Sequence, residues 1–459
     1  MKVLLVKVPS DMHVILPPIG LGYLAAYLKN KVKNINIAIL DCLKEKYDHK
    51  KFSEYIKETR PNVVGMTAFT MEIESAIKCC EEIKNIDKNI ITIIGGPHAS
   101  NDAEHVLCNE NVDFIFKGEA ELGFYELIES LKNKKSFSKV ANLGYKEKGK
   151  MKFNEMRFID NLDEISYPDY ELMKFSEYPK MYFMKKYPSA PILTSRGCPF
   201  SCTFCSAGKL SGKKFRYRTP KNIIEEIRFL KEKYHIKEFE IWDDNFSMNK
   251  ERAMEFCNLL IKENINLEWW CPNGLRIETL DEELLKRMKE SGCYAMAVGI
   301  ESGSEKIQKD MKKFLNFDKV REIVNLAHKI GIRTQGFFII GYPTETKEDI
   351  LKTIKFAKEL PLDRASFSLF QPLVGSDIYE CLEKEGKLKD INLNKCEYSK
   401  PSILPEGFND IKEVKKLQKK AILEFYLRPK VLSKFIIENL TIDQIKEIGS
   451  MFKKYILNK

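Results

Sequence analysis

The chain has 459 residues, of which 44% are hydrophobic and 31% charged, so it is long enough for two or three domains with sizeable cores. The formal net charge of +10 is modest, its lysines lie among glutamates at helical spacing, and no aromatic–basic motif accompanies them, so nucleic acid is not an expected partner. No apolar run is long enough for a membrane span and the N-terminus is unlike a signal peptide, so we expect a cytoplasmic protein.

Residues 1–140 alternate short apolar runs with amphipathic segments. The predicted strands are Val3–Val8, Ile35–Asp41, Val63–Thr67, Ile90–Gly95 and Phe114–Lys117. The predicted helices between them are Leu21–Lys31, Phe52–Thr59, Glu74–Lys84 and Leu122–Leu131. This alternation predicts a doubly wound, Rossmann-like α/β domain with a parallel sheet, and such sheets bind ligands at the carboxyl ends of their strands.

Four loops follow the predicted strands, and three of them carry glycines: Pro18-Ile19-Gly20-Leu21-Gly22, Gly95-Gly96-Pro97-His98 and Lys117-Gly118-Glu119. The fourth is Thr67-Ala68-Phe69-Thr70, which precedes the Gly95–Gly96 pair in the chain. Glycine allows a large ligand to approach the backbone closely. We therefore expect the ligand of this domain at this edge of the sheet.

Residues 141–189 are predicted to link this domain to the next. Residues 146–150 are typical of a hairpin turn, and Pro168, Pro179 and Pro188 interrupt any long helix. Aromatic residues of the linker such as Tyr178, Tyr182 and Phe183 are expected to pack rather than to contact a substrate.

The stretch after the linker contains three closely spaced cysteines. Cys198, Cys202 and Cys205 follow a short strand, Gly197 allows the chain to turn, and Pro199 keeps the next residues out of a regular helix. Three thiolates this close can converge on an iron–sulfur cluster. Because no fourth cysteine lies nearby, one iron would stay open to a ligand that the protein does not supply. A structural zinc site is the alternative, but structural zinc normally takes four protein ligands.

Residues 190–375 continue as six strand–helix units. After the strand that ends at the cysteine loop, the predicted strands are Glu238–Trp242, Leu267–Pro272, Ala295–Ile300, Thr334–Ile340 and Ala365–Phe370. Predicted helices include Asn222–Tyr234, Glu305–Met311 and Phe317–Lys329. Residues 376–459 are predicted to be helical, with Asp410–Tyr426 and Lys430–Asn439 apolar at helical spacing, and by position they could cap the mouth of the barrel.

The cysteine spacing and the units beyond it resemble the radical S-adenosylmethionine (SAM) superfamily, and residues 1–140 resemble the cobalamin-binding domain of one subset of it. The resemblance implies a partial (βα)6 barrel and a [4Fe–4S] cluster on Cys198, Cys202 and Cys205, with SAM bound to the open iron. It implies SAM contacts at Phe204, Asp243, Asp244, Asn245, Arg276, Glu301, Gly336 and Ile340. It implies cobalamin contacts at Gly20, Leu21, Thr67, Phe69, Thr70, Gly95, Gly96, His98, Gly118 and Glu119.

Two of these positions have alternatives. Arg276 could bind the SAM carboxylate through its guanidinium, or form a surface ion pair with Glu278 or Asp281. The Asp-x-His-x-x-Gly signature of histidine-ligated cobalamin is incomplete, since Asp11 and His13 are present but Leu16 replaces the glycine. The resemblance therefore implies cobalamin without a protein histidine ligand, with His98 as a lining residue. A nucleotide-binding Rossmann-like module is the alternative for the domain.

The function that the resemblance implies is a cobalamin-dependent radical SAM methyltransferase. It would act on an unactivated carbon of a small molecule or peptide through a 5′-deoxyadenosyl radical and methylcobalamin, with electrons from an external donor of the flavodoxin or ferredoxin type. The alternatives are a radical SAM cyclase or rearrangement enzyme that uses cobalamin without methyl transfer, and a non-enzymatic metal or cobalamin carrier. An RNA methylthiotransferase-like enzyme would need further cluster cysteines, and the candidates are poorly spaced: Cys42, Cys79, Cys80 and Cys108.

Overall fold

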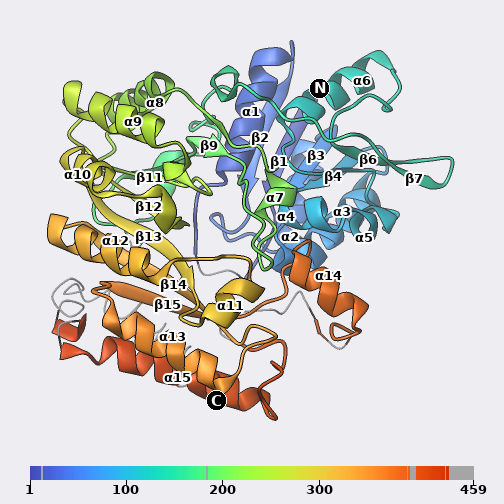
Figure 1. Cartoon of the computed structure of the whole chain (residues 1–459). Coiled ribbons are helices and arrows are strands. Elements are labelled where there is room, and N and C mark those ends of the chain that lie inside the picture. Colours follow the sequence, from blue (N-terminus) through green and yellow to red (C-terminus); the bar gives the residue numbers. More distant parts are fainter. Residues whose placement is uncertain (12–13, 182–183, 390, 393–399, 430, 434–459) are drawn as a thin grey trace.

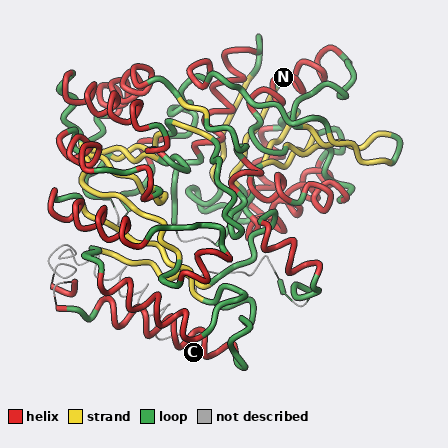
Figure 2. The backbone as a smooth tube through the Cα atoms, viewed as in Figure 1, coloured by secondary structure: helices red, strands yellow, loops and turns green. Residues whose placement is uncertain are grey.

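A computed structural model describes the chain except residues 12–13, 182–183, 390, 393–399, 430 and 434–459. Two separate sheets dominate it: a mainly parallel one built from the N-terminal third and a parallel one from the region after the linker (Figure 1). Helices lie outside both sheets, and loops fill much of the space between them (Figure 2). Across the described ranges, no helix combines the length and the apolar character that crossing a bilayer requires.

The N-terminal sheet has seven strands in the order β2-β1-β3-β4-β5-β6-β7. They are β1 (Lys2–Lys7), β2 (Asn36–Asp41), β3 (Val63–Thr67), β4 (Ile91–Gly95), β5 (Phe114–Phe116), β6 (Leu143–Glu147) and β7 (Lys150–Phe153). The first five pair in parallel, which confirms the predicted Rossmann-like domain. Because β1 pairs with both β2 and β3, the winding reverses there, and the crevice beyond the carboxyl ends of β1 and β3 is where such sheets bind ligands.

Two helical layers cover this sheet. One core holds α1 (Ile19–Lys31) and α6 (Glu121–Asn133) against the first face. The other core packs the opposite face with α2 (His49–Thr59), α3 (Ile73–Ile86), α4 (Pro97–Asn101) and α5 (Ala103–Cys108). Cys42, Cys79 and Cys80 are fully buried in the second core and are therefore core residues, whereas Cys108 is exposed.

The sheet extends further along the chain than residue 140, where the sequence placed the end of the domain. β5 pairs in antiparallel fashion with β6, and β6 pairs with β7 around the hairpin turn predicted at 146–150. The hairpin therefore adds two strands to the edge of the sheet. Apolar alternation was too weak in this lysine-rich segment to identify these strands from the sequence.

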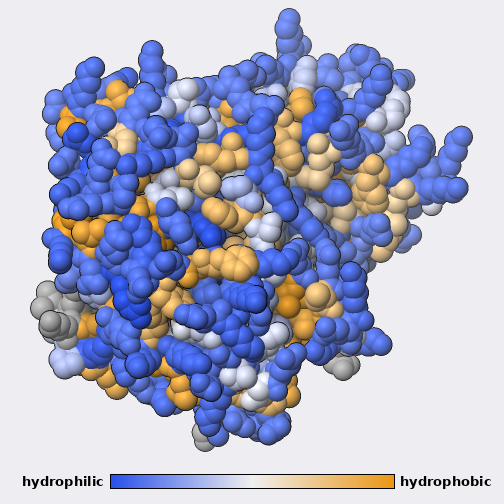
Figure 3. Space-filling view, viewed as in Figure 1, coloured by the Kyte–Doolittle hydropathy of each residue, from blue (hydrophilic) through white to orange (hydrophobic). Residues whose placement is uncertain are grey.

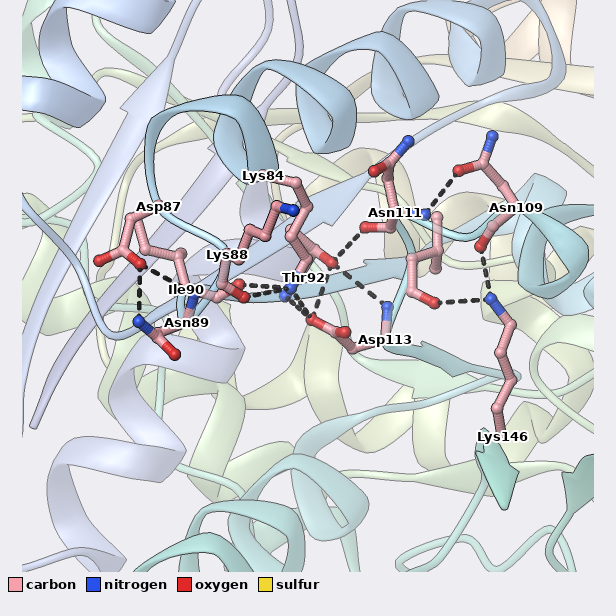
Figure 4. Close-up of polar contacts among 11 residues, drawn as sticks. Lys84, Asp87, Lys88, Asn89, Ile90, Thr92, Asn109, Asn111, Asp113 and Lys146 are labelled. Atoms are coloured by element: carbon pink, nitrogen blue, oxygen red, sulfur yellow. Dashed lines mark hydrogen bonds and ion pairs between the residues drawn. The ribbon is translucent and has the colours of Figure 1, made fainter. Parts of the chain in front are cut away.

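A polar network fixes the amino end of β4 against the loop before β5 (Figure 4). The Asp113 carboxylate accepts hydrogen bonds from the Thr92 amide at 2.8 Å and the Thr92 hydroxyl at 3.0 Å, and it pairs with Lys84 at 2.6 Å. Lys146 of β6 donates to the carbonyls of Asn109 and Val112. These contacts lie at the amino ends of the strands, opposite the edge at which the sheet is expected to bind its ligand.

The second sheet has six parallel strands in the order β15-β14-β13-β12-β11-β8. They are β8 (Ser189–Ile192), β11 (Glu238–Ile241), β12 (Glu268–Leu275), β13 (Cys293–Glu301), β14 (Arg333–Ile340) and β15 (Arg364–Leu369). The main helices that cover its outer face are α8 (Pro220–Tyr234), α9 (Lys250–Lys262), α10 (Glu282–Glu290), α12 (Phe317–Ile330) and α13 (Lys347–Glu359). β8 and β15 remain unpaired with each other, which confirms the partial (βα)6 barrel.

The C-terminal region completes the outer wall of the barrel. α15 (Ile411–Tyr426) packs on β15, where Gln418 donates to the Phe367 carbonyl at 2.7 Å and the Tyr426 hydroxyl donates to the Ala365 carbonyl at 2.9 Å. The expected cap over the barrel mouth concerned the whole of residues 376–459. Within the described part, α15 uses its apolar face on the outside of the sheet instead, whereas the Ile378 amide contacts the cysteine loop. The helix predicted at Lys430–Asn439 lies outside the described residues.

The surface is mainly hydrophilic on the face shown in Figure 3, with hydrophobic side chains gathered in patches across its middle. The short α7 (Ala207–Leu210), which follows the cysteines, lies in the same central region between the two sheets (Figure 1). The interface between the two sheets is thus where the functional residues are expected to meet.

Candidate cofactor site

The cysteine loop is closed at its base by a small two-stranded sheet. β9 (Ser195–Arg196) pairs with β10 (Arg216–Tyr217) in antiparallel fashion. The Cys198 amide donates to the Gly212 carbonyl at 3.1 Å. Gly197 has φ +88°, and a Cβ at this position would collide with the backbone carbonyl of Lys214. Glycine is therefore required for the chain to turn into the cysteine loop.

All three predicted cluster ligands are free thiols on this loop. Cys198 and Cys202 are half-buried and Cys205 is exposed. Burial raises the pKa of the Cys198 thiol, and the nearby charges of Asp244 and Cys202 act in the same direction. Because a metal takes the thiolate, assembly of a cluster here has to release protons.

The number of thiols on the loop fits a cluster with one open iron better than a structural zinc ion, which normally takes four protein ligands. Among the described residues, the three thiols do not form a group whose sulfur atoms all lie within 4.8 Å of one another. Tetrahedral zinc with bonds of about 2.3 Å would hold its sulfurs about 3.8 Å apart, whereas each cysteine of a cubane cluster binds its own iron. The donor set of three thiols on one turn therefore fits the predicted cluster.

Residues from the far side of the barrel hold the loop in place. The Thr203 amide donates to the Met311 carbonyl at 3.0 Å, and the Thr203 hydroxyl lies 2.8 Å from that of Tyr342. The amide of Ile378 in α14 (Asp377–Lys384) donates to the Thr203 carbonyl at 2.9 Å. Phe204 packs beside Tyr342 in a small apolar cluster. The backbone around Phe204 is thus fixed, as a predicted adenine contact requires.

The three polar residues that follow β11, Asp243, Asp244 and Asn245, differ in burial and in hydrogen bonding. Asp243 is buried and accepts hydrogen bonds from the Thr194 amide and the Ser195 hydroxyl, both at 2.6 Å. Its carboxylate thus fastens the end of β8 directly before the cysteine loop. Asn245 is also buried, and its side-chain oxygen accepts from Ser247 at 3.3 Å. Asp244 alone is exposed at the barrel mouth, where its charge already affects Cys198.

Arg276 forms the ion pair with Glu278 that was the alternative to binding the SAM carboxylate. Its Nε lies 3.1 Å from a Glu278 carboxylate oxygen, and it also donates to the Lys313 carbonyl at 2.7 Å. Its guanidinium stacks 3.8 Å above the ring of Phe200 in the cysteine loop. Asp281 pairs with Lys250 instead. Arg276 therefore braces the loop, and its contact with a SAM carboxylate stays a prediction.

Glu301 ends β13 in a strained backbone conformation, with φ +65°. Its buried carboxylate lies 3.3 Å from the Lys313 ammonium, and burial raises the pKa of this carboxyl while Lys313 opposes the rise. A Cβ on Gly299 would lie 2.5 Å from Glu301 Oε1. A non-glycine residue at φ > 0 beside a buried ion pair is typical of a functional site.

Two predicted adenine contacts face away from the barrel interior. Ile340 is fully buried in the core under the outer helices, and a Cβ on Gly336 would lie 2.8 Å from Leu362 in the same layer. Because side chains alternate along a strand, the neighbours Phe337 and Ile339 face the interior. Phe337 and Ile339 were not predicted from the sequence, although the alternation along β14 could have identified them as facing the interior of the barrel.

The ligand edge of the N-terminal sheet carries exposed apolar side chains. Phe69 is 52% exposed and Met71 is 45% exposed, both in the segment after β3. Gly96 follows β4 with φ +90°, and a Cβ there would lie 2.5 Å from the Thr67 hydroxyl. Close backbone approach beside exposed apolar groups fits the broad, largely apolar face of a corrin. Gly95 ends β4 at the same edge.

Three other predicted cobalamin contacts have different surroundings. Leu21 of α1 is buried in the core, whereas Gly20, at the start of α1, faces open space. His98 is only 3% exposed, its Nδ1 lies 3.2 Å from the Thr70 hydroxyl, and burial lowers its pKa. Its ring therefore sits behind the edge rather than on it. His13 lies outside the described residues.

Gly118 and Glu119 connect the two sheets. Gly118 has φ +69°, and a Cβ there would lie 2.9 Å from the Leu210 carbonyl in α7. The Glu119 carboxylate pairs with Arg216 at 2.5 Å and with Arg196 at 3.2 Å. The carboxylate is thus engaged between domains, so the residue reaches the cysteine loop rather than a free ligand edge.

A second acid strengthens this interdomain contact. Glu121 pairs with Arg196 at 2.7 Å. Burial opposes ionisation of Glu121, yet Arg196 lowers the pKa of its carboxyl below the usual range. Arg196 stands two residues before Cys198. Sequence reasoning missed Arg196, Arg216 and Glu121, because no local motif identifies a partner that is 75 or more residues away along the chain.

Comparison with known proteins agrees with this division of the chain. The Radical SAM superfamily model matches residues 192–357, and the B12 binding domain model matches residues 1–128. An uncharacterised methyltransferase of Pyrococcus horikoshii is 35% identical over 447 residues, which cover 96% of this chain and 95% of the relative. Cytidylyl-2-hydroxyethylphosphonate methyltransferase of Streptomyces wedmorensis is 28% identical, with 90% and 86% covered.

A solved structure has the same fold. The cobalamin-dependent S-adenosylmethionine radical enzyme OxsB, with aqua-cobalamin and S-adenosylmethionine bound, matches 99% of this chain and 71% of its own with a TM-score of 0.77 at 15% identity. The match spans both sheets, so the two-sheet arrangement is a shared fold.

Proposed function

Because this chain belongs to the radical SAM superfamily and carries a B12-binding domain, we propose that it methylates an unactivated carbon of a small molecule or peptide. It is an enzyme, and its cofactors are a [4Fe–4S] cluster, SAM and cobalamin. Together these groups supply a primary carbon radical that abstracts hydrogen and a methyl group for transfer. The similarity to methyltransferases over nearly the full chain supports methyl transfer as the outcome.

The ionic contact between the two domains is the observation that carries this proposal. Arg196 pairs with Glu119 and Glu121, which follow β5 at the ligand edge, and it stands two residues before the first cysteine. A single side chain, only 12% exposed, thus ties the position of the cysteine loop to that of the cobalamin edge. Methyl transfer between two cofactors requires such a fixed separation, because misplacement by about 1 Å can cost 100-fold in rate.

We assign the SAM-facing roles to the residues that remain available at the barrel mouth. Asp244 is exposed near Cys198 and suits an ammonium group. The Glu301–Lys313 pair, buried at the end of β13, suits a ribose, with Glu301 as the hydrogen-bond acceptor. The fixed backbone at Phe204 suits the adenine edge. Asp243 and Arg276 position the loop that carries the cysteines.

We assign cobalamin to the edge between β3 and β4. Thr67, Phe69, Thr70, Gly95 and Gly96 line that edge, and the exposed ring of Phe69 supplies an apolar contact. Electrons would come from an external donor of the flavodoxin or ferredoxin type, for which the exposed Cys205 marks the accessible side of the loop.

The test uses SAM that carries a deuterated methyl group. The anaerobically reconstituted enzyme is incubated with this SAM, a strong reductant and a panel of small molecules and peptides, and the products are examined by mass spectrometry. The proposal predicts a product heavier by one CD3 group in exchange for one hydrogen. If 5′-deoxyadenosine forms and a substrate is consumed without label, the enzyme is a cyclase or rearrangement enzyme instead. If the loaded protein forms no 5′-deoxyadenosine, a carrier role replaces the proposal.

A further inference from the structure

We propose that His98, Asp102 and His105 form a binding site for a divalent metal of the zinc class on the α4–α5 segment, separate from the cysteine loop. The three residues occupy positions i, i+4 and i+7, with Asp102 at the junction where α4 ends and α5 begins. No part of the proposed reaction requires this site. The inference therefore stands or falls independently of the methyl-transfer proposal.

The ligand atoms of the three side chains lie almost as close together as those around a bound metal ion. His98 Nε2 lies 3.9 Å and His105 Nδ1 lies 3.6 Å from the same Asp102 oxygen. The three ligand atoms all fall within 4.8 Å of one another. A tetrahedral zinc ion with bonds of about 2.1 Å separates its ligands by about 3.4 Å. Adjustments of a few tenths of an ångström between Asp102 and each histidine would bring those pairs to this separation.

The strongest evidence is an unsatisfied nitrogen. His98 is 3% exposed, and its Nε2 has no hydrogen-bond partner. Leaving a buried polar atom unpaired costs on the order of 1–3 kcal/mol. This nitrogen faces Asp102 rather than the exposed edge near Phe69. A bound cation would satisfy it.

The other nitrogen of His98 is oriented as in metal sites. Its Nδ1 lies 3.2 Å from the Thr70 hydroxyl, which can accept a hydrogen bond. Histidine ligands usually donate their second ring nitrogen to such a partner, which fixes the ring and directs the free nitrogen at the metal. The Thr70 contact therefore presents Nε2 as the coordinating atom.

A second cluster of possible metal ligands in the same domain lacks a free histidine nitrogen. His49, Cys79 and Glu82 also place three ligand atoms within 4.8 Å. There, however, His49 Nδ1 lies 3.2 Å from Glu82 and Nε2 lies 3.2 Å from the Ser75 hydroxyl. Both nitrogens are thus already partnered, and we propose no metal for this cluster.

A metal bound to these residues would stabilise the loop at Gly96, which belongs to the ligand edge of the sheet. His98 is two residues after Gly96, whose positive φ forms the close approach to Thr67. Cross-linking α4 to α5 through a metal would fix the start of α4 and hence this loop. Three protein ligands leave a fourth position for water, since His105 is largely exposed.

The experiment measures zinc in the fully loaded enzyme. The protein carrying its cluster and cobalamin is treated with ZnCl2, passed through a desalting column and analysed for zinc per chain, and affinity is measured by calorimetry. The variants are His105→Ala and Asp102→Asn, and the control is His328→Ala, an exposed histidine in α12. Iron and corrin contents are recorded for each protein.

We expect about one zinc per chain in the wild type and in His328→Ala. His105→Ala and Asp102→Asn should bind at least tenfold more weakly, because loss of even an outer-shell partner costs roughly 10- to 100-fold in affinity. Unchanged iron and corrin contents show that the variants are folded. Zinc that remains equally tight in His105→Ala and Asp102→Asn, or a wild type that binds none, would overturn the proposal.

Discussion

Glu345 shows how burial of one side chain makes stability depend on pH. One of its carboxyl oxygens accepts hydrogen bonds from the Gly341 and Tyr342 amides at 2.6 and 3.2 Å, and the other has no partner. Burial raises its pKa to about 8. The folded protein therefore keeps a proton that the unfolded chain releases above its ordinary pKa of about 4.3.

We predict that the Glu345→Gln variant becomes more stable relative to the wild type as the pH rises from 5 to 8. Unfolding of the wild type releases the proton of Glu345 in this window, so its stability falls by up to about 1.4 kcal/mol per pH unit. Glutamine keeps the acceptor oxygen and cannot ionise. Melting temperatures of both proteins at pH 5, 6, 7 and 8 measure the effect. A difference that stays constant over this range would contradict the assignment.

At this scale, the sequence predicted the residue types of the site better than their partners. The cysteine spacing predicted three cluster ligands, and the fold holds all three as free thiols on one loop. Asp243 and Arg276 were placed at the correct strand ends, but their partners Thr194 and Phe200 are set by the way strands and loops meet in the fold. Partner identity across the sheet is not encoded in local spacing.

Among the elements, the cysteine loop depends on the backbone of Gly197. We predict that Gly197→Ala loses most of its cluster, because the left-handed conformation costs roughly 1–2 kcal/mol for other residues and the added methyl group meets the Lys214 carbonyl. Iron per chain after reconstitution measures the effect. Gly208→Ala in α7, directly after the loop, is the control, since the nearest atom to the added methyl group would be 3.7 Å away. Equal iron contents in the two variants would show that the cysteine loop can form without glycine at position 197.

The Asp113 network at the amino end of β4 is predicted to contribute stability without affecting cofactors. Asp113→Ala leaves the Thr92 amide and Lys84 without this carboxylate (Figure 4), which should lower the free energy of unfolding by about 1–3 kcal/mol. The exposed Asp87→Ala, which loses only contacts to Asn89, should change it by less than about 0.5 kcal/mol. Denaturant titration and corrin content are the measurements. Loss of corrin binding with unchanged stability in Asp113→Ala would contradict this account.

The elements themselves were predicted well wherever apolar periodicity was strong. The five parallel strands of the first sheet and the strands of the barrel lie where alternation and turns placed them. The β6–β7 hairpin was missed as part of the sheet because its outer strand is lysine-rich and exposed. The packing of α15 on the outside of the barrel was not predicted, because an amphipathic pattern shows that one face is buried but not which surface buries it.

For the whole molecule, the contact between the two sheets is the feature that sequence reasoning could not supply. Glu121 and Arg196 are 75 residues apart and belong to different domains. Their pairing depends on how the domains dock. Because the fold brings them together, the position of the cysteine loop is tied to that of the cobalamin edge.

We predict that Glu121→Gln binds both cofactors but turns over more slowly. Removing one charge of this buried pair leaves Arg196 with Glu119 at 3.2 Å, so the stability loss should be at most about 3–5 kcal/mol. Iron and corrin contents should stay near wild-type values, while the rate of 5′-deoxyadenosine or product formation falls at least tenfold through misplacement of the loop. Glu129→Gln, at a half-buried position of α6 whose carboxylate lies 4.0 Å from Lys132, is the control. A wild-type rate in Glu121→Gln would show that the contact does not position the cofactors.

The most direct measurement compares the wild type with a variant in which Cys198, Cys202 and Cys205 are all replaced by alanine. Both proteins are reconstituted without oxygen, with iron, sulfide and cobalamin, and are then incubated with SAM and a strong reductant. The wild type should contain about four irons and one corrin per chain and should form 5′-deoxyadenosine, whereas the variant should keep its corrin, lack iron and form none. A fully loaded wild type that does not cleave SAM, or a variant that cleaves it equally well, would contradict the account.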